Sequence, residues 1–136
     1  MNANDLERAL RATLTGGTAL TALLAGTASV YNGVVPMGQA FPAIVYSHQG
    51  GGDINESPHR SRNLLYTVKA ISAVSMTQAG NIDAAADALL HGKALTVSGW
   101  TNYWLMRESD LRLVETTPEG GSYFTSGGVY RIRIAQ

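Results

Sequence analysis

The C-terminal segment Val129–Ala135 alternates strictly between apolar and polar side chains. Its tyrosine and two isoleucines fall on one side of the pattern, and Arg131 and Arg133 fall on the other. A repeat of two residues is the signature of a β-strand that buries one face and exposes the other. A single strand of this kind is not stable, so the rest of the chain must supply partner strands and a layer that covers the apolar face.

Six further segments are typical of strands, because they are rich in β-branched and aromatic residues and are bounded by turn residues. The longest, Arg62–Val74, alternates between two faces over most of its length. Small and acidic residues between Tyr103–Arg107 and Leu111–Thr116 predict a hairpin there. The remaining candidates are Ala28–Val35, Phe41–Tyr46 and Tyr123–Phe124.

Three segments repeat apolar residues at helical spacing. Asn4 and Glu7 predict a capping box at the start of the first, and Ser75 and Gln78 predict one at the start of the third. Glycines follow the second and third segments, where helices commonly end. The predicted helices cover Asp5–Thr13, Thr18–Ala25 and Met76–His91.

Predicted strands and helices do not alternate regularly along the chain, so a doubly wound parallel sheet is not expected. The sequence predicts an α+β fold, a mostly antiparallel sheet of about five strands with helices packed on one face. With 136 residues, the chain is expected to form one domain over residues 1–136. The glycine-rich segment Gln49–Pro58 is expected to be a flexible loop.

No established catalytic or metal-binding motif is present. The chain has no cysteine, which removes thiolate chemistry and cysteine-based metal sites. His48 and His59 bracket Asp53 and Glu56, but nothing in the spacing brings four ligands together. Gly50–Gly52 lacks the flanking residues of a phosphate-binding loop. We expect no catalytic residue, no cofactor and no metal.

Two further groups of side chains each have two possible interpretations. Asp83 and Asp87 resemble a carboxylate pair, although exposed acids on the polar side of a helix are the commoner case. Trp100, Tyr103 and Trp104, with the nearby Arg107, either stack on nucleobases or bury one aromatic face.

The formal net charge is +0, which disfavours general binding to nucleic acid or to an anionic membrane. No apolar window approaches the roughly 20 residues of a membrane span, so we expect a soluble protein.

The distribution of charge is more informative than its sum. Between Arg11 and Asp53 lie 41 residues without Asp, Glu, Lys or Arg. Such a stretch is either core with uncharged loops or a subunit interface, because charge is depleted at the centre of interfaces. We favour the interface. Arg131 and Arg133 either contact a partner or protect a sheet edge from aggregation. The candidate interface residues are Gln49, Asp53, Glu56, Arg60, Arg131 and Arg133.

Several segments in this order resemble a known family. An A-L-R-A-x-L pattern is followed by T-A-L-L-A-G, F-P-A-I-V-Y, a long strand and D-A-A-A-D-A-L-L. This arrangement is similar to the tail terminator or tail-to-head joining (tail completion) proteins of long-tailed bacteriophages. The matching positions are Leu6, Leu10, Leu20, Leu23, Leu24, Phe41, Pro42, Ile44, Leu89 and Leu90.

The resemblance implies a non-enzymatic structural protein of the virion tail or neck, assembled in the host cytoplasm. Its implied partners are further copies of itself, most simply as a hexameric ring, the tail tube protein and the head–tail connector protein. The ring would cap the tube, end its polymerisation and join the tail to the head. DNA would pass through it without sequence-specific binding, and no membrane is involved. The alternatives are another neck or minor capsid component, and a small ligand-binding or hydrolytic α+β domain.

Overall fold

The computed structural model describes residues 2–136, in which three helices and six strands form one layer of helices on one sheet. The helices are α1 (Ala3–Thr15), α2 (Thr18–Thr21) and α3 (Met76–Leu90). The strands are β1 (Val30–Asn32), β2 (Ala43–Ile54), β3 (Ser61–Ser72), β4 (Thr96–Val97), β5 (Trp100–Thr116) and β6 (Ser122–Ala135).

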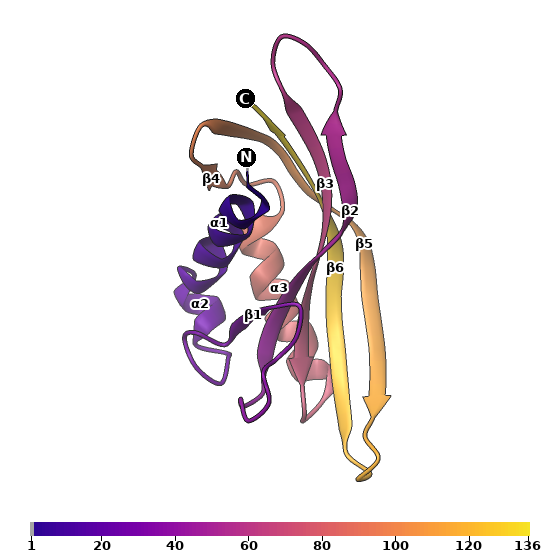
Figure 1. Ribbon diagram of the computed structural model, residues 1–136. Coiled ribbons are helices and arrows are strands. Elements are labelled where there is room, and N and C mark those ends of the chain that lie inside the picture. Colours follow the sequence, from indigo (N-terminus) through magenta and orange to yellow (C-terminus); the bar gives the residue numbers. More distant parts are fainter. Residues whose placement is uncertain (1) are drawn as a thin grey trace.

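The strands form one sheet in the order β1-β2-β3-β6-β5-β4. All neighbours are antiparallel except β1 and β2, which are parallel. The helices lie along one face of this twisted sheet, and the other face has no helical cover (Figure 1). The α+β class is confirmed. The expectation of about five strands was wrong, because two very short strands, β1 and β4, extend the sheet at its edges.

β5 and β6 are each longer than the sequence pattern predicted. β5 runs without a break through the hairpin expected between Tyr103–Arg107 and Leu111–Thr116. Register shifts at 102/104 and 107/109 insert extra residues into β5, and such bulges interrupt the alternation without ending the strand. Tyr123–Phe124 and Val129–Ala135 are likewise parts of one strand, joined through Gly127 and Gly128.

The glycine-rich segment Gln49–Pro58 is only partly a loop. β2 continues through the three glycines to Ile54 and pairs with the start of β3, so the loop expectation was wrong for 49–54. Gly51 has φ +89°, and a Cβ there would lie 2.1 Å from the carbonyl oxygen of Asn63. Gly51 therefore allows a close approach of the two strands, a role that composition does not distinguish from flexibility.

The helix caps differ in detail from those predicted. In α1 the capping box is made by Asn2, whose side chain accepts from the Asn4 amide at 3.0 Å, and by Asp5. The predicted pair, Asn4 and Glu7, was two residues too late. At α3, Ser75 accepts from the Gln78 amide at 3.1 Å as expected. The Gln78 side chain instead accepts from Ser72.

The core lies between the helices and the sheet. α1 contributes three fully buried leucines, Leu6, Leu10 and Leu14, at helical spacing. β3 and β6 contribute alternate residues to the same layer over part of their length, whereas β2 and β5 contribute fewer. The buried strand residues include Ile44, Tyr46, Leu64, Tyr66, Val68, Ala70, Leu105, Tyr130, Ile132 and Ile134.

A charged network fastens α3 to this layer. The Arg107 guanidinium on β5 donates to both Asp83 carboxylate oxygens, at 2.8 and 3.0 Å, and to the carbonyl of Gly127 at 2.7 Å. Tyr130 donates to Asp87 at 2.8 Å. Hydrogen bonds to Asp83 raise the pKa of Arg107, while burial and the bond to Asp87 raise the pKa of Tyr130. Asp83 is thus a buried structural partner, and not an exposed acid on the helix surface.

The Arg107 network predicts a large difference between two arginine substitutions. Arg107→Ala leaves Asp83 buried without its cationic partner, and we expect a loss of about 3–5 kcal/mol in the free energy of unfolding. Arg131→Ala, which removes the more exposed pair with Glu108, should lose at most about 1 kcal/mol. Chemical denaturation of both variants tests this. Equal losses would contradict a dominant role for Arg107.

Two glycine substitutions make a second matched pair. A Cβ at Gly127 would lie 2.4 Å from the Val68 carbonyl oxygen, whereas one at Gly52 would meet nothing within 4 Å. Gly127→Ala must therefore push β6 away from β3, and we expect a loss of about 1–3 kcal/mol. Gly52→Ala should change the stability by less than about 0.5 kcal/mol. Thermal and denaturant unfolding of both proteins measures the contrast, and a stable Gly127→Ala protein would refute the packing argument.

Candidate assembly surface

The six candidate interface residues lie at the same end of the sheet. Gln49, Asp53, Glu56 and Arg60 belong to the outer half of the β2–β3 hairpin, which projects beyond the helices (Figure 1). Arg131 and Arg133 lie on β6, next to β3, with Arg133 opposite Asn63 in the sheet. Sequence spacing alone did not predict this proximity, because it depends on the pairing of β3 with β6.

The charges on the hairpin are compensated locally. Asp53 contacts Arg60 at 2.5 Å and Arg62 at 3.0 Å. The Arg60 hydrogen bond, helped by both positive charges, lowers the pKa of the Asp53 carboxyl below its usual value. Ser61 donates to Glu56 at 3.4 Å. The hairpin therefore presents an internally paired surface, which can be buried against a partner with little unpaired charge.

The two β6 arginines differ in their partners. Arg131 donates to Glu108 at 2.5 Å and to the Asn63 side chain at 2.8 Å. The Arg133 guanidinium lies 5.3 Å from the centre of the Trp104 ring, a cation–π arrangement. Among residues 2–136 no carboxylate lies within 4 Å of Arg133, and its Nε is buried without a hydrogen-bond partner.

The aromatic group around Trp104 is split between core and surface. Trp100 packs against the core cluster, whereas Tyr103 and Trp104 are exposed. The nearby arginine of the sequence prediction is Arg107. It lies on the helix side of the sheet and forms an ion pair with Asp83. A continuous stacking platform with a basic rim is therefore not present in the described part of the chain.

The histidines do not converge on a metal site. His48 packs edge-on against Tyr66, with ring centres 5.3 Å apart, and Asp53 is engaged by arginines. His91 accepts a hydrogen bond from the Arg107 amide through Nδ1. Within residues 2–136, no three His, Asp or Glu side chains are grouped closely enough to hold a metal ion.

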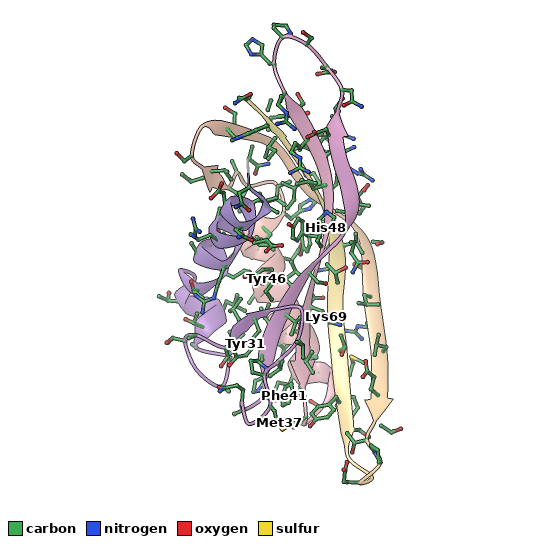
Figure 2. All side chains as sticks on the ribbon, in the orientation of Figure 1. Tyr31, Met37, Phe41, Tyr46, His48 and Lys69 are labelled. Atoms are coloured by element: carbon green, nitrogen blue, oxygen red, sulfur yellow. The ribbon has the colours of Figure 1, made fainter. Side chains whose placement is uncertain are left out.

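The uncovered sheet face, here called the open face, carries a hollow of about 250 Å³. Val45, Lys69 and Ile71 of the sheet line it, and the β1–β2 loop covers part of it. Figure 2 shows Lys69 on the sheet, with Met37 and Phe41 at the lower end of the molecule. The lining has one amine and one carboxylate, Lys69 and Glu115, and is otherwise mostly apolar. It is better suited to packing than to acid–base chemistry.

Four exposed apolar side chains lie outside the residues predicted from the sequence. Val34 is 70% exposed and Met37 is fully exposed in the β1–β2 loop. Val74, after β3, and Val114, on β5, are 72% and 54% exposed. The run Val34-Val35-Pro36-Met37 between two glycines was the available signal, since such apolar runs are rare in solvated loops.

No helix among residues 2–136 combines the length and apolar character that crossing a membrane requires.

Comparisons with known proteins identify a family and a related fold. Residues 8–121 match the family model described as Tail completion protein gp17. A chain in a solved structure titled "Virion of native gene transfer agent (GTA) particle" is similar over 98% of this chain and 97% of that chain, with a TM-score of 0.81 and 20% sequence identity. That likeness shows a shared fold. No curated protein sequence matches the chain. Because the family match spans most of its length, the chain belongs to the Tail completion protein gp17 family.

Proposed function

We propose that this chain is a non-enzymatic structural protein that forms a hexameric ring on the end of a phage-type tail. The ring caps the tail tube, ends its polymerisation and joins the tail to the head connector. Family membership supports a role in tail completion. The fold shared with a chain of a gene transfer agent virion supports a place in such a particle.

The observation that carries the ring is the exposure of the uncharged stretch between Arg11 and Asp53. About half of its residues are exposed, in the first half of α2, in the segment before β1 and in most of the β1–β2 loop. Were the stretch mainly core, its lack of charge would need no further explanation. An exposed surface this poor in charge is typical of the centre of a subunit interface.

A ring of identical subunits needs two different contact surfaces on each subunit. The uncharged surface lies on the β1 side of the sheet, and the opposite edge is formed by β5 and β4. When one edge of each subunit contacts the opposite edge of the next, every subunit is rotated by the same angle from the one before it. The subunits close into a ring when a whole number of these rotations makes a full turn.

We assign the projecting hairpin and the β6 arginines to contacts with the tube or the connector. The hairpin extends past the helices, so it reaches beyond the body of a ring subunit. Arg133 has a guanidinium without an acidic partner in the described chain, and it is available to a carboxylate on another protein. Gln49, Asp53, Glu56 and Arg60 accompany it on the same end of the sheet.

The ring predicts six copies of the protein at the head-proximal end of each tail. Cryo-electron microscopy of purified particles should show six-fold density there. Particles made without the protein should carry overlong or headless tails, because nothing stops tube growth or docks the head. One copy per tail, or a ring of another number, would contradict the hexamer.

The docking role of β6 predicts an effect of Arg131→Glu combined with Arg133→Glu. The subunit should still fold, because both side chains lie on the open face, but head joining should fall at least about tenfold through lost attraction and new repulsion. The matched control is Arg8→Glu with Lys93→Glu, the same change in charge at exposed sites elsewhere. Counts of joined particles compare the two. Normal joining by the β6 variant would reject this role.

A further inference from the structure

Arg133 and Trp104 form a cationic and aromatic pair on the open face, here called the Arg–Trp pair. They lie opposite each other in the register of β6 and β5, and the guanidinium carbon is 5.3 Å from the centre of the indole ring. Trp104 is 40% exposed. Tryptophan and arginine are enriched among the residues that dominate binding energy at protein interfaces. The pair is therefore suited to anchor a partner on this face.

Arg133 is the one arginine at this end of the sheet whose charge is unmatched in the described chain. Arg60, Arg62 and Arg131 each contact a carboxylate. Among residues 2–136, no carboxylate lies within 4 Å of the Arg133 guanidinium. The side-chain oxygen of Asn63, opposite Arg133, already accepts from Arg131 at 2.8 Å. A guanidinium in this position can bind a carboxylate through two parallel hydrogen bonds.

The side chain of Asn102 fixes the backbone beneath the Arg–Trp pair. Its amide nitrogen donates to the carbonyl oxygens of Trp104 and Arg133, at 3.0 Å each. Its oxygen accepts from the Leu95 amide at 2.8 Å. A register shift makes Tyr103 an extra residue of β5 and brings Trp104 opposite Arg133, and such bulges often re-aim a side chain next to a functional site. The pair is held in place before a partner binds, which lowers the entropy cost of binding.

The same row of the sheet ends on β2 at a position without a side chain. Arg133 lies between Trp104 of β5 and Asn63 of β3, and Asn63 lies opposite Gly52. The subunit itself does not require this glycine, because its φ is not positive and a Cβ there would meet nothing within 4 Å. Glycine inside a strand often marks a site where another backbone approaches closely. Gly52 therefore leaves room for a segment of another protein in the row of the Arg–Trp pair.

The charges around the pair favour a protein ligand over nucleic acid. Asp53 on β2 and Glu108 on β5 lie at the same end of the sheet and offset neighbouring arginines. A nucleic-acid backbone requires a continuous basic surface, and these acids would repel its phosphates. One carboxylate side chain requires only one unmatched arginine, which is what Arg133 supplies.

We infer that the Arg–Trp pair binds one carboxylate side chain in an extended acidic segment of a neighbouring tail or neck protein, and that this segment crosses Gly52. The inference rests on the proposed docking role of β6 and names its anchor. Arg133 donates two hydrogen bonds to the carboxylate. The Trp104 ring holds the guanidinium in position, and the missing side chain at Gly52 admits the backbone of the partner.

Zero-length cross-linking identifies the carboxylate. In assembled particles that carry Arg133→Lys, the positive charge is kept, and a carbodiimide joins the new amine to a carboxylate in contact with it. Mass spectrometry should find position 133 linked to an aspartate or glutamate of another protein. Arg131→Lys is the matched control, because the contact of Arg131 with Glu108 predicts a link within the chain.

Aromatic substitutions test the contribution of the tryptophan. Trp104→Leu removes the ring beside Arg133, and we expect the number of joined particles to fall about tenfold. Trp104→Phe keeps an aromatic face and should retain most of the joining. Tyr103→Leu is the control at the adjacent bulged position and should have little effect, because Tyr103 is not opposite Arg133.

Gly52→Val separates docking from subunit stability. Valine favours strands, and a Cβ at this position meets nothing in the subunit, so the unfolding midpoint should stay the same or rise. The added side chain should obstruct the incoming segment and reduce joining at least about tenfold. Thr96→Val, at an exposed position on β4, is the control and should leave joining unchanged.

The outcomes separate the anchor from the docking role. If joined particles show no link from position 133, or a link within the chain alone, the carboxylate anchor is overturned while the docking role stands. Normal joining by Gly52→Val would overturn the path across β2. Trp104→Leu particles that join normally but lose DNA would assign the pair to phosphate, which also overturns the inference. Normal joining by Arg131→Glu with Arg133→Glu would overturn both the anchor and the docking role.

Discussion

The position of Arg107 depends on two consecutive glycines in the central strand next to it. A Cβ at Gly128 would lie 2.4 Å from the Arg107 Nε, and one at Gly127 would strike β3. With both glycines in place, the Arg107 guanidinium crosses β6, donates a hydrogen bond to the Gly127 carbonyl and reaches Asp83 on α3. Helix and sheet are thus joined by an oriented ion pair as well as by apolar packing. Such a pair fixes one geometry, because a displaced partner would leave a buried charge uncompensated.

The Arg107–Asp83 ion pair lies on the helix side of the sheet, and polar groups on that side bond within the subunit. On the helix side, Asp83, Asp87 and Tyr130 have their hydrogen bonds within the chain. On the open face, Arg133 lacks an acidic partner, and Glu115 is also unpaired among residues 2–136. An antiparallel sheet tolerates one solvated face. The protein can therefore use that face for assembly without loss of its own core.

Sequence patterns predicted those helices and strands that depend on residues close together in the chain. The α3 cap follows from Ser75, and the buried face of β6 follows from the alternation around Ile132, which is fully buried. The length of β5 did not follow, because bulges hide the period of two. The strand at Gly50–Gly52 also did not follow, since glycine is read as flexible unless its neighbour across the sheet is known. The burial of Asp83 depended on Arg107, 24 positions away, so no helical pattern could reveal it.

The same distinction applies to the surface. The absence of charge before Asp53 was visible in the sequence, but it had two meanings, core or interface, and the exposure of the β1–β2 loop is the observation that favours the interface. A charged loop there would stay hydrated and would resist burial by a neighbour. An uncharged loop with a fully exposed methionine loses little hydration free energy when a neighbour buries it. The flexible methionine side chain can also adapt its shape to the surface that it contacts. The chain therefore keeps charge where a single geometry must be fixed, inside the subunit at Arg107. In the ring proposed above, it omits charge from the surface assigned to subunit contacts.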